Sequence, residues 1–239
     1  MALEATGGHM SAGRWGIRQR RLRYGDHPSQ VGVLYGEGPV AVVIHGGFWK
    51  VTYDLWLMHP VCMDLAQRGW AAWNIEYRRL GDGGGVPATL DDVAAAIDHL
   101  GVLDLGLDLS RVVAVGHSAG GHLAAWAALR RDPGVAVTGL VAQAGVLDLQ
   151  RARELHLSNG VVDRFLAGHP TSEASPIELL PLRVPALLTH GALDDVVPLE
   201  ISERFAAASG ATLHVQPDGE HFGHIDPADP LWGAVTEWL

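Results

Sequence analysis

A serine at position 118 stands in the pattern G-x-S-x-G, which reads GHSAG over residues 116–120. The apolar run RVVAV precedes the pattern and the alanine-rich stretch GHLAAWAAL follows it, so we expect a strand, a sharp turn and a helix in that order. Such a turn exposes the serine hydroxyl at the end of the strand, and its glycines are needed because side chains would collide there. The N-terminal end of the following helix adds positive potential near a developing oxyanion. We therefore predict that Ser118 is a catalytic nucleophile; a tight turn with a capping serine is the simpler alternative.

A serine nucleophile needs a base that takes its proton, usually a histidine oriented by a carboxylate. The stretch PALLTHGALDDVVP places Asp194 just after an expected strand, and GEHFGHIDP places His221 just after the next one. Both residues thus lie at strand ends, at the sheet edge where Ser118 emerges. The order serine, acid, histidine is the chain order of hydrolases built on this turn. We predict a catalytic triad of Ser118, Asp194 and His221.

Other residues near these positions remain alternatives. Asp195 adjoins Asp194, and Asp148 follows another expected strand, where some hydrolases carry their acid. His117 and His122 flank the nucleophile turn, where helix packing or hydrogen bonding is a more ordinary role for them than catalysis.

A metal-dependent hydrolase that uses His221, His224 and Asp226 is a second hypothesis. The pattern H-x-x-H-x-D on a loop lacks the helical i, i+4 spacing of zinc proteases, so it is not specific for a metal. If His221 is instead the base, His224 is a supporting or surface residue. We predict no metal and no cofactor. The glycine-rich loop GDGGG at 81–85 has no P-loop lysine and no dinucleotide-binding pattern, so we do not expect nucleotide binding.

The stretch HGGFW at 45–49 ends an apolar run that reads AVVI. Glycines at the end of a buried strand allow backbone shapes that a side chain would forbid, so the N–H groups of this turn are candidates for binding a ligand. A simple turn after a core strand is the alternative. Phe48, Trp49 and His117 are candidate walls of a substrate pocket, and Trp56 is another candidate, although tryptophans are more often core residues.

Segments that resemble strands alternate with segments that resemble helices along the chain. The expected strands are residues 31–35, 40–44, 70–77, 111–115, 140–144, 186–189 and 212–216. The expected helices are residues 57–68, 89–100, 119–130, 199–208 and 231–239. This alternation predicts an α/β fold with a mostly parallel sheet and helices on both faces, as one domain over residues 11–239. At the start of the helix 89–100, Thr89 can cap, and Asp91 and Asp92 suit the positive end of the dipole.

The stretch 148–182 is the least regular part of the chain and contains three prolines. We expect one or two short helices there. A long insert between two core strands is often functional, so it is either a small lid over the site or a surface connection.

The composition fits a compact globular protein with a large core. Of the 239 residues, 48% are hydrophobic and 18% are charged, and the mean hydropathy is +0.12. The net charge of -10 should repel nucleic acid and anionic membranes, so neither is an expected partner. The basic run RQRRLR at 18–23 is expected to be a solvated strand face or arm. The single cysteine, Cys62, lies among apolar residues and is expected to be a buried thiol.

We expect a cytoplasmic location. The first residues lack the apolar segment of a secretory signal, and no run approaches the roughly 18 apolar residues of a membrane span. The sequence GGHM before Ser11 resembles a cloning remnant, with Met10 as a natural start, so we expect residues 1–10 to lie outside the fold. The sequence is compatible with a homodimer.

From about Val31 to its end the chain resembles the α/β-hydrolase superfamily, through HGGFW at 45–49, GHSAGG at 116–121, HGALDDVVP at 190–198 and HF at 221–222. HGGFW is similar to the HGGxW motif of arylformamidases (kynurenine formamidases) and related esterases, and differs from the HGGG motif of the hormone-sensitive-lipase group. The stretch EYRRLGDGGGVPATLDD, from Glu76, also resembles this group. The family pattern HGxxDxxVP selects Asp194 over Asp195 as the acid.

The resemblance also implies roles for the loop after the early strand. In the superfamily this loop supplies N–H groups of the oxyanion hole, which implies Gly47 and Phe48 as donors together with Ala119 after the nucleophile. Family histidines at the position of His45 pack behind the hole, so His45 is implied to organise the loop.

We therefore expect a cofactor-free serine esterase for small esters with short acyl groups, acting through an acyl-enzyme. An arylformamidase that uses the same apparatus on an amide is the alternative. A non-catalytic binding protein with a hydrolase fold ranks last, because all three triad candidates are present.

Overall fold

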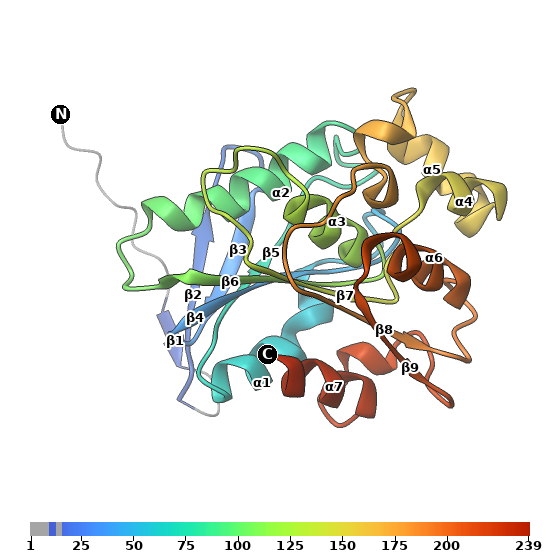
Figure 1. The fold of residues 1–239 in the computed structure, drawn as a ribbon. Helices are drawn as coiled ribbons and strands as arrows, with labels where there is room; N and C mark the ends of the chain where they lie inside the picture. The colour runs from blue at the N-terminus through green and yellow to red at the C-terminus, as the bar shows by residue number, and fades with distance from the viewer. Residues whose placement is uncertain (1–9, 13–15) are drawn as a thin grey trace.

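The computed structural model describes residues 10–12 and 16–239, and its strands form a single sheet (Figure 1). The strands are β1 (Met10–Ala12), β2 (Arg18–Arg23), β3 (Val31–Tyr35), β4 (Pro39–Ile44), β5 (Ala71–Ile75), β6 (Asp108–His117), β7 (Gly139–Gln143), β8 (Ala186–Gly191) and β9 (Thr212–Gln216). Their order across the sheet is β1-β2-β3-β5-β4-β6-β7-β8-β9. All neighbours from β5 to β9 are parallel, whereas β1, β2, β3 and β5 pair antiparallel. The predicted mostly parallel sheet is confirmed.

The sheet begins earlier than the sequence predicts. Residues 1–9, expected to be a remnant outside the fold, lie outside the described residues. Met10, however, pairs with Arg20 between β1 and β2, so Met10 belongs to the sheet. The basic run 18–23 forms the strand β2, as expected, with side chains that are partly or fully exposed.

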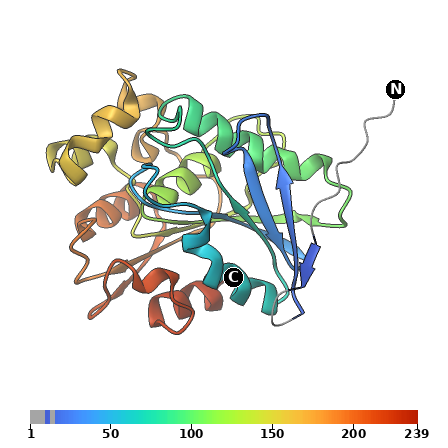
Figure 2. The ribbon, with the colours of Figure 1, turned by 180° about the vertical axis from the view of Figure 1, so that it is seen from behind.

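Helices cover both faces of the sheet. They are α1 (His59–Gln67), α2 (Ala88–Asp98), α3 (Ala119–Ala128), α4 (Leu149–Glu154), α5 (Leu157–Leu166), α6 (Leu199–Ser209) and α7 (Pro230–Trp238). α1 and α7 lie on one face, and α2, α3 and α6 lie on the other, as the front and rear views show (Figures 1 and 2). This arrangement confirms the predicted α/β-hydrolase-like layering.

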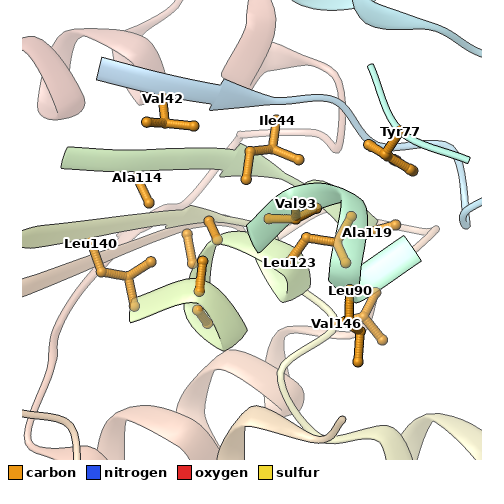
Figure 3. Packing of buried hydrophobic residues seen from close by; sticks show 14 of the residues in the cluster. Val42, Ile44, Tyr77, Leu90, Val93, Ala114, Ala119, Leu123, Leu140 and Val146 are labelled. Atoms are coloured by element: carbon orange, nitrogen blue, oxygen red, sulfur yellow. The ribbon is translucent and has the colours of Figure 1, made fainter. Parts of the chain in front are cut away.

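The central strands are apolar along their whole length because both faces are covered. In β4, the side chains of Val42 and Ile44 belong to the core beneath α2 and α3, while those of Ala41 and Val43 belong to the core beneath α1 and α7. Figure 3 shows part of the first of these cores, with Ile44 of β4, Val93 of α2 and Leu123 of α3 labelled. The packed centre leaves the carboxyl ends of the strands as the place for a site.

The start of α2 differs from the sequence prediction. Thr89 does not cap this helix, which begins at Ala88 after Pro87 without a side-chain cap. Instead, Thr89 lies inside the first turn of α2, and its hydroxyl donates to the carbonyl of Arg78, before the helix, at 2.6 Å. Asp92 is buried and holds the Arg78 guanidinium at 2.6 Å, so this carboxylate is used in an ion pair rather than at the helix dipole.

The insert 148–182 contains α4 and α5 and two single 3₁₀ turns. One contact of the insert is made by Phe165 of α5, whose ring stacks on that of Trp49 with 4.2 Å between centroids. The backbone carbonyl of Phe165 also accepts a hydrogen bond from the N–H of Val86 at 2.8 Å. The insert is therefore packed onto the loop that follows β4.

Two further expectations concern the chain as a whole. Cys62 is buried, and burial raises the pKa of its thiol well above the ordinary value, so it is a structural residue as predicted. Within residues 10–12 and 16–239, the helices are all too short or too polar to span a membrane. The cytoplasmic location stays a prediction.

Candidate active site

Ser118 occupies a one-residue turn between β6 and α3. Its backbone has φ 57° and ψ −119°, a combination that residues other than glycine rarely adopt, and only 2% of the residue is exposed. The neighbouring glycines are required by space, since a Cβ on Gly116 would collide with the carbonyl of Gly120, and a Cβ on Gly120 with that of Ile44. The Ser118 N–H donates to the carbonyl of Gln143 on β7 at 2.7 Å. This strained turn, which costs about 1–3 kcal/mol, is the geometry that the G-x-S-x-G pattern predicts.

Asp194 and His221 form a close pair beside this turn. His221 Nδ1 lies 2.6 Å from Asp194 Oδ2, and Asp194 Oδ1 accepts from the N–H groups of Val196 and Val197 at 2.8 Å each. Burial alone would raise the pKa of Asp194, but hydrogen bonds from His190 and His221 outweigh it and hold that pKa well below its ordinary value. Asp194 is therefore ionised, and it fixes His221 with the hydrogen on Nδ1 and the lone pair on Nε2.

The alternative acids lie elsewhere. Asp195 is exposed, and the side chain of Asp148 is engaged in the fold. Asp148 Oδ1 caps α4 by accepting from the N–H of Arg151 at 2.9 Å, and its Oδ2 accepts from Arg204 at 2.8 Å. The geometry thus pairs His221 with Asp194 and not with Asp195 or Asp148.

A pocket of about 220 Å³ opens at the nucleophile turn and contains both Ser118 and His221. Its lining residues are Gly47, Phe48, Tyr53, Leu57, His117, Ser118, Val196, His221 and Phe222. Phe48 and His117 were expected there, whereas Tyr53, Leu57, Val196 and Phe222 were not predicted as pocket residues. In the described part of the chain, no hydrogen bond joins Ser118 Oγ to His221, and such bonds often tighten only when substrate binds.

Trp49 is a correction to the expected pocket wall. Its indole is fully buried, stacked on Phe165 and edge-on to His122, and it does not line the pocket. Phe48 and Trp49 both have positive φ, and this turn sends the two neighbouring rings in different directions. Trp56 is 49% exposed and contacts His59 rather than the pocket.

The insert 148–182 contributes no lining residue to this pocket. Its α5 carries Phe165 against Trp49, and Ser158 accepts a hydrogen bond from Lys50 Nζ at 2.7 Å. The insert thus contacts the HGGFW loop, and its role as a lid or as a surface connection stays a prediction.

The HGGFW loop passes directly over the nucleophile. A Cβ on Gly46 would lie 2.9 Å from Ser118 Cβ and 2.7 Å from the carbonyl oxygen of His117. Gly47 has φ 105°, which favours glycine, and a Cβ there would lie 2.7 Å from the Tyr53 ring. Among the described residues, neither Gly47 nor Phe48 donates its backbone N–H to a protein acceptor. The N–H of Ala119, at the first position of α3, has no partner within its helix.

His45 anchors this loop, as the sequence analysis predicts. Its Nε2 lies 2.9 Å from Glu76 Oε1, and its Nδ1 lies 2.8 Å from the carbonyl oxygen of Gly46. Tyr77 donates from its hydroxyl to the His45 carbonyl at 2.8 Å and stacks on the imidazole with 4.4 Å between centroids. These contacts fix the loop from the side opposite to the pocket.

The residues of the metal hypothesis have separate partners. His221 pairs with Asp194, the Nδ1 of buried His224 lies 3.0 Å from Thr189 Oγ1, and Asp226 accepts from the N–H of Ala228. Across residues 10–12 and 16–239, no three His, Cys, Asp or Glu side chains are grouped so that they could hold a metal ion. The structure does not bring His221, His224 and Asp226 together as ligands.

Comparison with known proteins identifies a matching family model and relatives that are named esterases. The BD-FAE family model matches residues 34–208. Esterase LipC of Mycobacterium tuberculosis is 30% identical over 219 residues, which cover 79% of this chain and 54% of that protein. Esterase LipQ of the same organism is 30% identical over 191 residues, covering 71% of this chain and 45% of that protein. The chain thus spans about half the length of the curated relatives it matches.

Solved structures share the architecture at lower identity. Esterase B from Lactobacillus rhamnosis superposes with a TM-score of 0.77 at 21% identity, covering 93% of this chain and 84% of that chain. Esterase 2 of Thermogutta terrifontis, phosphorylated by paraoxon, superposes with a TM-score of 0.74 at 22% identity, covering 92% and 93%. The expected α/β-hydrolase fold is confirmed, while the narrower resemblance to arylformamidases stays a prediction.

Proposed function

The chain belongs to the BD-FAE family of α/β-hydrolases, and we propose that it is a serine esterase that cleaves small carboxylic esters. The observation that carries this proposal is the placement of Ser118 and His221 in one pocket, with His221 hydrogen-bonded to the ionised Asp194, whose side chain is buried. Nucleophile, base and acid thus come together from three separate segments of the chain. The relatives that are named esterases support the same reaction class.

In the proposed reaction, Ser118 Oγ attacks the ester carbonyl while His221 Nε2 takes the hydroxyl proton. Asp194 keeps the imidazole oriented and stabilises its positive charge. The C–O bond of the ester then breaks, the alcohol leaves with the proton from His221, and the acyl group stays on Ser118. A water molecule next attacks the acyl-enzyme, gives a proton to His221 and releases the acid, and that proton returns to Ser118.

The oxyanion hole in this proposal consists of the backbone N–H groups of Gly47, Phe48 and Ala119. The close approach of Gly46 to Ser118 supports it, because the next N–H groups of the loop then lie beside the carbonyl under attack. The start of α3 adds the positive end of a helix dipole. Such donors each contribute about 10²–10³ to the rate of acyl transfer.

The pocket supports a short acyl group. Its volume of about 220 Å³ is small, and its apolar lining comes from Phe48, Tyr53, Leu57, Val196 and Phe222. A long chain gains about 0.8 kcal/mol per methylene only where a groove can bury it, and the insert 148–182 adds no such groove. We expect formyl, acetyl and butyryl groups to be better substrates than dodecanoyl.

Aryl formamides are a second proposed substrate class. The HGGFW motif favours them, and the aromatic rings of Phe48, Tyr53 and Phe222 offer packing for an aryl leaving group beside the smallest acyl group. Amide cleavage also needs His221 to protonate a poor leaving amine, so esters should react faster unless the pocket is shaped for the formamide.

The test is a hydrolysis panel combined with covalent labelling. The kcat/KM should be highest for acetyl or butyryl p-nitrophenyl esters, and a fluorophosphonate should add one adduct by intact mass. A formamide rate well above every ester would make the arylformamidase the better assignment. Loss of activity with a chelator, without labelling, would favour the metal-dependent hydrolase, and absence of both labelling and turnover would leave a binding protein.

A further inference from the structure

His117 lies between the nucleophile and its base without belonging to the triad. It directly precedes Ser118, only 1% of it is exposed, and its ring centroid is 4.6 Å from that of His221. Its Nε2 lies 2.9 Å from the backbone carbonyl oxygen of His221. Because a carbonyl oxygen only accepts, Nε2 of His117 must carry the hydrogen. Burial, followed by the nearby His221, lowers the pKa of His117 to about 3, so the ring stays neutral.

The base needs such a contact because no long element holds it. His221 stands in the loop 217–229, between the end of β9 and the start of α7, with a single 3₁₀ turn over Gly223–Ile225. Two side chains at the ends of β6 and β7 reach into this loop. His117 donates to the carbonyl of His221, and Gln143 donates to that of His224 at 2.8 Å. His117 and Gln143 are direct partners in the register of the two strands.

We propose that His117 is a positioning residue for the reaction: its Nε2–H holds the backbone of His221 and thereby aims the imidazole at Ser118. Because His117 and Ser118 are adjacent in the chain, one peptide unit ties the position of the base to that of the nucleophile. Asp194 fixes the rotation and tautomer of the His221 ring. His117 fixes the position of the backbone from which that side chain extends. This inference rests on the proposed esterase function.

The choice of variants follows from the bond that is proposed to matter. In glutamine, Nε2 is separated from Cα by as many bonds as the imidazole Nε2, so His117→Gln retains a donor that can reach the His221 carbonyl. In asparagine, the amide nitrogen matches the position of Nδ1 and falls short. His117→Asn therefore removes the contact and His117→Gln restores it.

The decisive measurement is kcat and KM of these variants for p-nitrophenyl acetate, in the wild-type and in the His221→Ala background. A misplaced base costs up to about 10²-fold, so His117→Asn should lower kcat about 30-fold with KM within about threefold. His117→Gln should recover most of that loss. In the His221→Ala background, His117→Asn should change the residual rate less than about twofold, because the group it positions is gone.

His122→Asn is the matched control. It breaks an equally buried bond from imidazole Nε2 to a carbonyl, 2.9 Å from Ala174 O, away from His221. It should lower the unfolding temperature and leave kcat within about threefold of the wild type. An equal loss in His117→Asn and His122→Asn would mean that the effect is general loss of packing.

Three results would overturn the inference. They are a His117→Gln variant that is folded but as slow as His117→Asn, a His117→Asn variant that keeps kcat, and an equal loss in the His221→Ala background. If His117→Asn does not fold, the His117→Gln rate still decides, since a folded glutamine variant below about a tenth of wild-type kcat contradicts the donor role. An inactive wild-type protein would instead refute the proposed function, so the two failures are distinguishable.

Discussion

Ser118 and His221 face the same pocket from regions of very different construction. Ser118 is fixed by its own backbone, in a one-residue turn where Gly116 and Gly120 touch neighbouring main chain. His221 stands in the loop 217–229 and is held by side chains from distant segments, namely Asp194 at 2.6 Å from its Nδ1 and His117, which donates to its carbonyl. The nucleophile is thus placed by local geometry, and the base by long-range hydrogen bonds. Substitutions should therefore act differently in the two regions.

The largest effect is expected from the nucleophile itself. Ser118→Ala removes the attacking oxygen, so hydrolysis should fall by about 10⁵-fold or more while the fold remains. The far-UV circular dichroism and unfolding temperature should match those of the wild type, and a fluorophosphonate should no longer label the protein. Retention of activity within a few-fold of the wild type would contradict the assignment of Ser118.

A smaller but still large effect is expected on the side of the base. Asp194→Asn leaves the shape intact but favours the wrong tautomer of His221, so kcat should fall by about 10³–10⁴. Asp195→Asn is a matched control one position away on an exposed residue, and its kcat should stay within about threefold. Asp148→Asn should affect stability rather than kcat, because Asp148 caps α4 and pairs with Arg204. A greater loss of kcat in either control would move the acid there.

The third prediction concerns the region of Ser118 and displaces the backbone of the loop that passes over it. In Gly46→Ala the new Cβ meets Ser118 Cβ at 2.9 Å and the His117 carbonyl at 2.7 Å, so the loop that carries Gly47 and Phe48 must shift. Displacing oxyanion donors should lower kcat by about 10² with little change in KM. Gly233→Ala is the control, because a Cβ on that α7 glycine meets nothing within 4 Å. Equal kcat in the two variants would show that the loop tolerates displacement.

The contrast between the two regions also explains what the sequence could predict. Ser118 and the glycines around it are read from five consecutive residues, because the geometry they require is local. Asp194 and His221 followed from strand ends and chain order, and the structure brings them together as expected. The contacts that hold the loop 217–229 run from His117 to the carbonyl of His221 and from Gln143 to the carbonyl of His224. They join strand ends with a loop far along the chain, so no local sequence pattern predicts them.

The pocket and the insert show that residues adjacent in the sequence can lie in different parts of the structure. Trp49 adjoins Phe48, yet two positive φ angles send its ring into the core, where Phe165 of the insert covers it. Tyr53, Val196 and Phe222 line the pocket from three separate segments. Val196 and Phe222 lie within motifs that the sequence analysis quoted, HGALDDVVP and HF, so proximity to Asp194 and His221 was the signal that could have identified them.

The smallest effect concerns pH, and it compares buried histidines of the two regions. His122 of α3 and His224 of the loop 217–229 are fully buried. Burial lowers the pKa of His122 to about 4 and that of His224 well below its usual range. In the unfolded chain each takes up a proton near pH 6.5, whereas in the folded protein it does so only at lower pH. As the pH falls from 7 to 4.5, the unfolded state therefore binds more protons, so each histidine should lower the free energy of unfolding, and His122 should lower it by about 2 kcal/mol.

Glutamine in place of either histidine removes that titration, so His122→Gln and His224→Gln should each show a shallower fall of stability with pH than the wild type. The measurement is urea unfolding at pH 7, 5.5 and 4.5. The difference in slope, not the stability at pH 7, isolates the titration, because the lost packing is the same at every pH. If the free energy of unfolding depends less on pH in His224→Gln but not in His122→Gln, protonation of the loop that carries His221 causes the loss of stability in acid. The region of the base, which side chains hold, is then less stable to acid than the region of the nucleophile. Parallel slopes in all three proteins would show that neither imidazole is neutral because of burial.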